Sequence, residues 1–359
     1  MSRERIETSV GRKTVLRTVA NWSWVTTLVC GLAGTGNAQT SGARIDQTTF
    51  VPIGGIEQWI SIRGDDRANP VLLVVHGGPG EAQWPQAEIY KRWEKAFTIV
   101  QWDQRGAGHT FGRFGTKTPD VTLDRISKDG VELAEYLCRI LGKKKIIVLG
   151  HSWGSIVGTR MVQMRPNLFA AYVGTGQVTS WAAMVNTQYD LVLAKARRTG
   201  DPTTIKQIEA DRPDPANAKQ YFNFSHKYQV RSLWPEPDQA WLRHLRSQLP
   251  ELQARDPEQF KYLEEGSVFQ GEQVLPDQLA TNLPKTACDI NIAYFVIQGR
   301  DDIVTPTQTA VEYFKCVRAP KKELILIANA GHFAFMTASE KFLRALTSTV
   351  RPIAIKGGA

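Results

Sequence analysis

"IIVLGHSWGS", residues 146–155, is the most informative stretch of this sequence. Its aliphatic start is typical of a buried strand, and the residues after Ser152 can begin a helix. In a tight strand-to-helix turn, the central residue takes a strained backbone conformation. Glycines on either side, here Gly150 and Gly154, remove side chains that would clash. The pattern predicts a serine whose hydroxyl projects from the tip of a rigid turn.

Short apolar runs alternate with helical patterns on both sides of this stretch. A hairpin is expected over 49–63. Further strands are expected at 71–75, 97–102, 146–149, 170–174, 292–298 and 323–327. Helices are expected at 87–95, 123–141, 155–164, 307–315 and 334–350. Apolar strands separated by helices indicate an α/β fold, a mostly parallel doubly wound sheet covered on both faces.

Residues 181–284, called the insertion below, have a different composition. They are charged, punctuated by proline and helical in pattern, and the sheet pattern resumes after them. We therefore expect a core of residues 39–180 and 285–359, with the insertion forming a helical cap. Ligands bind at the carboxyl ends of strands in such sheets, so the cap is expected to cover those ends.

The first 38 residues have the layout of a secretory signal peptide. Basic residues come first, an apolar run follows at 25–33, and small residues stand at 36–38. The run is too short to span a bilayer, so no stable membrane anchor is expected. These features predict a periplasmic or secreted protein; a disordered tail is the alternative.

Composition narrows the range of partners. Hydrophobic residues make up 42% and charged residues 22% of the 359 residues, as in folded globular proteins. The formal net charge is +9. No basic amphipathic helix or block of arginines and aromatics accompanies that charge, so no nucleic-acid partner is expected.

Four cysteines are present, without the spacings typical of metal sites, so no metal is expected. Cys288 and Cys316 flank one strand–helix pair and are expected near the same end of the sheet. An exported protein could join them in a disulfide. Cys138 is expected to be an apolar filler on a helix.

A serine hydroxyl needs a base and the base needs a carboxylate, and the sequence offers both. His332, in "NAGHFAF", stands just beyond the last expected strand. Asp301 and Asp302 follow strand 292–298, and spacing alone does not choose between them. The amides of Gly78, in "VVHGGPG", and Trp153 are expected to stabilise an oxyanion.

Five motifs together resemble the α/β-hydrolase superfamily and, within it, the proline iminopeptidase family. They are "HGGPG" at 76–80, "WDQRGAG" at 102–108, "GHSWGS" at 150–155, "GRDDIVTP" at 299–306 and "AGH" at 330–332. The similarity covers about residues 45–180 and 290–350. The resemblance implies that the acid is Asp302, which completes a triad with Ser152 and His332. It also implies Gly78 and Trp153 as oxyanion donors and no cofactor.

The sequence departs from the family in the insertion. The family binds the substrate's free amine with glutamates of its cap, one of them in a Glu-Asn-His-Tyr-Phe stretch that this chain lacks. The insertion contains other glutamates, so the substrate-binding residues stay unassigned. These glutamates include Glu209, Glu236, Glu264, Glu265 and Glu272.

Three functions are compatible with these patterns. The first is a serine hydrolase that forms an acyl-enzyme and releases the N-terminal residue of a short peptide or small molecule. The second is a carboxylesterase or small-molecule amide hydrolase with an apolar pocket built from tryptophans of the insertion. The third is a non-catalytic binding protein on the same scaffold. The oligomeric state is not predicted.

Overall fold

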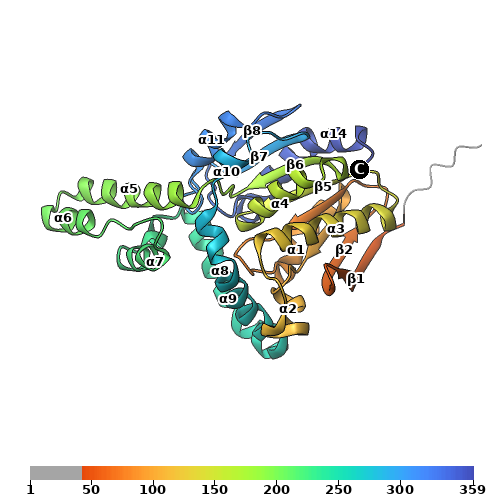
Figure 1. Cartoon of the computed structure of the whole chain (residues 1–359), viewed down its shortest axis with the longest axis horizontal. Coiled ribbons are helices and arrows are strands. Elements are labelled where there is room, and N and C mark those ends of the chain that lie inside the picture. Colours follow the sequence, from red (N-terminus) through yellow and green to blue (C-terminus); the bar gives the residue numbers. More distant parts are fainter. Residues whose placement is uncertain (1–42) are drawn as a thin grey trace, which may run out of the picture. The chain divides into compact units, whose positions relative to one another are not determined.

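The computed structural model describes residues 43–359, and the expected signal peptide lies outside this range. The described residues form one sheet of eight strands in the order β1-β2-β4-β3-β5-β6-β7-β8. The strands are β1 (Ile45–Ile53), β2 (Ile56–Gly64), β3 (Val71–Val75), β4 (Thr98–Trp102), β5 (Ile146–His151), β6 (Phe169–Thr175), β7 (Ala293–Gly299) and β8 (Lys322–Ile327). Strand β2 pairs antiparallel with β1 and β4, and all other pairs are parallel. The expected α/β fold is confirmed (Figure 1).

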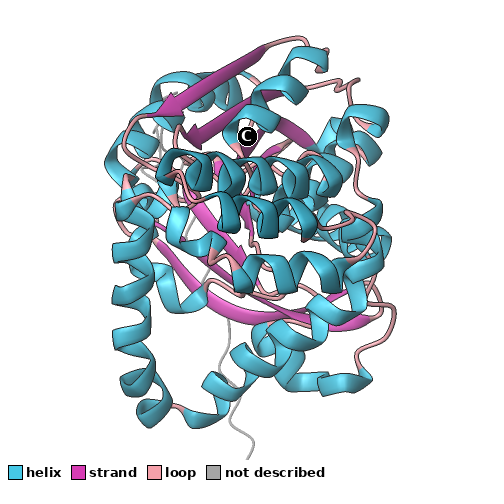
Figure 2. Ribbon diagram, turned by 90° about the vertical axis from the view of Figure 1, so that its left-hand side faces the viewer, coloured by secondary structure: helices cyan, strands magenta, loops and turns pink. Residues whose placement is uncertain are grey.

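Helices lie on both faces of the sheet (Figure 2). They are α1 (Ala87–Tyr90), α2 (Gly108–Phe114), α3 (Leu123–Leu141), α4 (Trp153–Met164), α5 (Trp181–Thr199), α6 (Pro202–Ala210), α7 (Ala218–Lys227), α8 (Glu236–Arg255), α9 (Pro257–Ala280), α10 (Leu283–Thr286), α11 (Thr307–Cys316), α12 (Ala334–Thr337), α13 (Ser339–Ala345) and α14 (Arg351–Lys356). Alternate residues of β3 separate the two cores. Leu73 belongs to the apolar cluster that includes residues of α3 and α4, whereas Leu72 and Val74 belong to the cluster that includes Phe342 of α13. This alternation buries β3 completely, as its continuous apolar run predicts.

Two expected helices are interrupted. The segment 87–95 contains the short α1 and a separate 3-10 turn, Trp93–Lys95. The segment 334–350 breaks at Ala338, whose φ of −126° and ψ of 38° leave the helical region. Immediately after the break, the Ser339 hydroxyl accepts a hydrogen bond from the Trp93 indole at 3.0 Å. A tertiary contact that the helical pattern does not encode therefore joins both interrupted segments.

The insertion, between β6 and β7, forms helices α5 to α9. Helices α8 and α9 are joined by Asp256 alone and lie side by side (Figure 1). A separate small apolar cluster holds α5, α6 and α7 together; it includes Tyr189, Ile208 and Phe224. In the range 43–359, no helix is long and apolar enough to cross a membrane.

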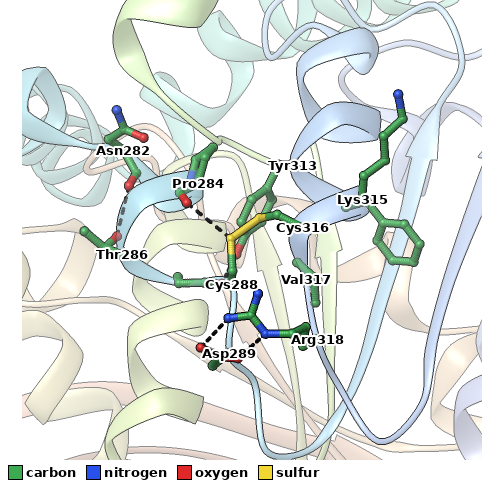
Figure 3. The surroundings of a disulfide bond; sticks show 12 residues. Asn282, Pro284, Thr286, Cys288, Asp289, Tyr313, Lys315, Cys316, Val317 and Arg318 are labelled. Carbon is green, nitrogen blue, oxygen red and sulfur yellow. Dashed lines mark hydrogen bonds and ion pairs between the residues drawn. A yellow bond between two sulfur atoms is a disulfide. The ribbon is translucent and has the colours of Figure 1, made fainter.

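A disulfide joins Cys288, after α10, to Cys316, at the end of α11 (Figure 3). The Cα atoms of the two residues are 5.4 Å apart, within the range usual for this bond. Next to it, Arg318 donates two hydrogen bonds to Asp289, each 2.6 Å long. Cys138 is a free, half-buried thiol, and burial raises its pKa.

Arg105, in the "WDQRGAG" motif, is a structural residue. Its side chain is buried and donates to both carboxylate oxygens of Asp129, on α3, at 2.7 and 3.1 Å. It also donates to the carbonyl oxygens of Gly54 and Pro119. The guanidinium thus ties the β1–β2 turn and the chain before α3 to the core.

Candidate active site

Ser152 lies at the sharp turn between β5 and α4. Its φ of 51° and ψ of −121° are rare for a residue with a side chain. A Cβ on Gly154 would lie 2.0 Å from the Val75 carbonyl oxygen, and one on Gly150 would lie 2.4 Å from the Gly154 carbonyl oxygen. A larger residue at position 154 would collide with the end of β3, and one at position 150 would collide with the first turn of α4. The expectation of a strained turn with obligatory glycines is confirmed.

The end of β6 brings Ser152 and His332 to the same place. The Ser152 amide donates to the Thr175 carbonyl oxygen at 3.0 Å. Gly176 follows directly, and a Cβ on it would lie 2.8 Å from Cε1 of His332. Within residues 43–359, no hydrogen bond joins the Ser152 hydroxyl to the His332 imidazole. In free enzymes such bonds are often long and tighten only when substrate binds.

Asp302 orients the His332 imidazole. The Nδ1 atom of His332 lies 3.0 Å from Oδ2 of Asp302, and both side chains are buried. The other oxygen, Oδ1, accepts from the amides of Val304 and Thr305. Asp301 is exposed, so the structure places Asp302 and not its neighbour against the imidazole. With Nδ1 protonated toward Asp302, Nε2 is free to accept a proton.

Thr305 is a further member of this group that sequence reasoning missed. Its hydroxyl donates to Oδ2 of Asp302 at 2.8 Å and lies 3.2 Å from Nδ1 of His332. A threonine three residues after an aspartate can make this local contact, so the stretch "DIVT" could have predicted it.

The His332 imidazole lies among carboxylates. Burial acts to lower the pKa of His332, but the charge and hydrogen bond of Asp302 and the charges of Asp238 and Glu81 outweigh it. The pKa therefore lies above its ordinary value. These carboxylates stabilise the imidazolium that forms when His332 takes a proton.

Gln104 ties together the two segments that carry Gly78 and Trp153. Its side chain donates to the His76 carbonyl oxygen at 3.0 Å and accepts from the Trp153 indole at 3.2 Å. Gly78 has a φ of 104°, which only glycine adopts readily. Trp153 is the first residue of α4, and a first helical amide has no partner within its helix.

A cavity of about 570 Å³ opens beside these residues, and its volume is that of a small-molecule site. Ser152, Gly78 and Trp153 line it from the sheet side. Side chains of the insertion complete the wall. They include Trp181, Met184, Tyr221, Phe222, Arg231, Trp234 and Glu272.

Most glutamates of the insertion lie away from this cavity. Glu209, Glu236 and Glu265 form surface ion pairs with Arg197, Arg243 and Lys261. Glu272 lines the active-site cavity, and Glu264 lines a neighbouring one.

Glu81, directly after "HGGPG", is a second carboxylate in the active-site cavity that sequence reasoning missed. Its side chain lines the cavity and is accessible to water. Burial raises the pKa of Glu81, while the charges of His332 and Arg231 act to lower it. Its position directly after the glycine motif could have predicted that it lies near the site.

No histidine of residues 43–359 lines the active-site cavity, and His332 adjoins it through Thr305, a lining residue whose hydroxyl is 3.2 Å from Nδ1. Burial lowers the pKa of His76 and of His151, so both are neutral packing residues. His109 binds Asp103 at 2.8 Å, and His226 and His244 are exposed residues of the insertion. Across residues 43–359, no cluster of three or more His, Cys, Asp or Glu is arranged to hold a metal ion.

Residues 70–339 match the family described as alpha/beta hydrolase fold, and the chain belongs to that family. The probable aminopeptidase YbaC of Bacillus subtilis (strain 168) is 25% identical over 316 residues, covering 83% of this chain and 94% of that protein. The proline iminopeptidase of Lacticaseibacillus rhamnosus (strain Lc 705) is 22% identical over 314 residues, covering 83% and 95%.

Solved structures agree on the fold. A proline iminopeptidase-related protein from Thermus thermophilus superposes with a TM-score of 0.56 at 20% identity, covering 88% of this chain and 98% of that one. The chain is therefore a hydrolase of the α/β-hydrolase fold, similar to aminopeptidases and proline iminopeptidases.

Proposed function

We propose that this hydrolase cleaves an amide bond through an acyl-enzyme and releases the N-terminal residue of a short peptide or amino-acyl compound. The observation that carries the proposal is the Asp302–His332 hydrogen bond beside the strained Ser152 turn, at the wall of a cavity. The names of the relatives support the reaction class.

In this mechanism the Ser152 oxygen attacks the substrate carbonyl, and Nε2 of His332 takes the hydroxyl proton. Asp302 stabilises the resulting imidazolium. The amides of Gly78 and Trp153 bind the oxyanion. His332 then gives its proton to the departing amine, and the C–N bond breaks. A water molecule, deprotonated by His332, releases the acyl group from Ser152.

A free amine on the substrate would find two carboxylates in the cavity, Glu81 and Glu272. Neither makes an ion pair with a lysine, arginine or histidine in the described part of the chain. A charge-assisted hydrogen bond from an ammonium group would compensate either of them.

The test compares alanyl and prolyl arylamides, each with a free and a blocked amine, on purified protein. Cleavage of the free-amine compounds and loss of cleavage on blocking would support the proposal. Equal rates on blocked and free compounds would contradict it.

A carboxylesterase is the second candidate, because the cavity walls also carry Trp181, Met184 and Trp234. An apolar acyl group could fill this region without any carboxylate. Short-chain aryl esters, assayed beside the arylamides, separate the two functions.

We also propose that the insertion caps the site and that the enzyme is exported. Residues from both the core and the insertion line the cavity, which supports the first point. The Cys288–Cys316 disulfide, typical of oxidising compartments, supports the second. Mass spectrometry of the protein from its native host would reveal whether the first 38 residues are removed.

A further inference from the structure

A second cavity, of about 480 Å³, adjoins the active-site cavity. The two share the lining residues Glu81, Ser267 and Val268. Val268, on α9, is 62% exposed although it is aliphatic. These three residues therefore border both cavities.

The second cavity also borders the catalytic centre. Gly77, His151 and Phe333 line it. Each of them is the immediate neighbour in sequence of a residue of the proposed machinery, namely Gly78, Ser152 and His332. The second cavity thus borders the segments that carry Gly78, Ser152 and His332.

The lining of the second cavity is mainly apolar. Its aliphatic and aromatic side chains come largely from α8 and α9 and include Leu242, Leu245, Leu249, Phe260, Leu263 and Met336. Four large apolar residues in the range 43–359 are exposed. Of these, Phe222, Leu249 and Val268 line one or both cavities, and only Ile355 does not. Apolar surface is thus concentrated around the site, as expected of a binding surface.

We propose that the second cavity binds an unbranched or aromatic apolar chain of the substrate while the scissile carbonyl sits at Ser152. The substrate is then bipartite. Its polar, amine-bearing end faces Glu81 and Glu272, and its apolar end lies between α8 and α9. This inference rests on the proposed function for the position of the carbonyl. Either the leaving group or the acyl group can carry the apolar chain.

Two substrate series show which part of the substrate carries the apolar chain. Alanyl n-alkylamides vary the leaving group, and aryl esters of n-alkanoic acids vary the acyl group. In one of them, kcat/KM should rise roughly threefold to fourfold per methylene until the cavity is filled. Leu245→Trp on α8 and Leu263→Trp on α9 fill the cavity from two walls and should flatten that rise. Leu252→Trp, on α8 but outside both linings, is the matched control and should keep it.

Binding of 1-octanol and 1-butanol to the full-length Ser152→Ala protein, measured by calorimetry, supplies a readout that needs no turnover. Octanol should bind more tightly than butanol, and adding Leu245→Trp should remove the difference. A flat dependence on chain length in both substrate series, or octanol binding that survives both tryptophan variants, overturns the inference. If the wild type cleaves neither the amides nor the esters, but octanol binds as expected, the proposed function is refuted and the second cavity remains a binding site.

Discussion

Asp238, on α8 of the insertion, accepts a hydrogen bond from the backbone amide of His332 at 2.5 Å. The carboxyl group is buried, and its other oxygen has no partner within residues 43–359. It packs so closely on Gly331 that a Cβ there would lie 2.3 Å from Oδ2. One side chain of the insertion therefore holds the loop that carries the proposed catalytic base.

Asp238→Ala should lower kcat more than it raises KM, because the His332 amide loses its acceptor and the loop loses its anchor. Loss of a buried hydrogen bond to a charged group costs about 1–3 kcal/mol of stability. Asp238→Asn retains an acceptor oxygen and should restore much of kcat. Steady-state kinetics with thermal unfolding of both variants provide the measurement. Equal kcat in the alanine variant and the wild type would show that the contact does not position His332.

The stability of the protein should depend on pH through the same carboxyl. Burial raises the pKa of Asp238, so the folded state holds this proton to higher pH than the unfolded state does. The contribution of Asp238 to the stability of the wild type should therefore decrease as the pH rises above about 4, the ordinary aspartate range. Asp238→Asn lacks that loss, and the stability difference between the two proteins should shift in favour of the variant as the pH rises. Urea unfolding across this pH range tests the sign.

Ser152→Ala should abolish hydrolysis while leaving the fold intact. Removing the nucleophile of such a triad lowers kcat by roughly 10⁶-fold. The hydroxyl makes no hydrogen bond within residues 43–359, so its loss should change the midpoint of thermal unfolding little. Turnover close to that of the wild type would eliminate Ser152 as nucleophile.

The acid limb of kcat/KM should report the pKa of His332. The base must be neutral, and its pKa is raised, so activity should fall on acidification through a pH above about 6.5. Glu81→Gln removes one of the negative charges that raise this pKa and should move the limb to lower pH. Glu312→Gln, in an exposed ion pair on α11, is the control and should leave the limb in place. A limb unmoved by Glu81→Gln would contradict the charge arrangement described above.

Breaking the Arg105–Asp129 pair from one side should be costly. Arg105→Met leaves the Asp129 carboxylate buried without its main partner and should lower the free energy of unfolding by about 3–5 kcal/mol. The double variant Arg105→Met/Asp129→Leu removes both charges and should lose less than the sum of the single variants. Denaturant unfolding measures all three. Additive losses would show that the two side chains do not interact.

The disulfide should contribute measurably to stability. It closes a loop between residues 28 positions apart, and loops of this size are worth about 2–4 kcal/mol. Cys288→Ser/Cys316→Ser should lower the free energy of unfolding by that amount, and reductant should then have no further effect. Cys138→Ser, which alters the free thiol, is the control. An unfolding midpoint of the wild type that is the same with and without reductant would contradict the prediction.

Local patterns were sufficient for much of the core. The apolar runs of β3 and β5 predict buried parallel strands, and Gly150 and Gly154 predict the Ser152 turn, because these features depend on residues next to one another in the chain. The helix expected over 334–350 was wrong in its continuity. The contact of Ser339 with Trp93 joins segments far apart in sequence, and the periodicity of apolar residues does not predict such a contact.

The sequence by itself determined the nucleophile turn and the α/β class, since backbone sterics and burial leave few alternatives for such patterns. Residue spacing left Asp301 and Asp302 open, the motif resemblance pointed to Asp302, and the structure places Asp302 against His332. Only the tertiary structure decided that Glu81 and Glu272 line the active-site cavity and that Asp238 anchors the loop that carries His332. Each of these choices depends on how strands, loops and the insertion pack in three dimensions. Contacts between residues far apart in the sequence depend on the cooperative packing of the whole chain, so local sequence patterns do not predict them.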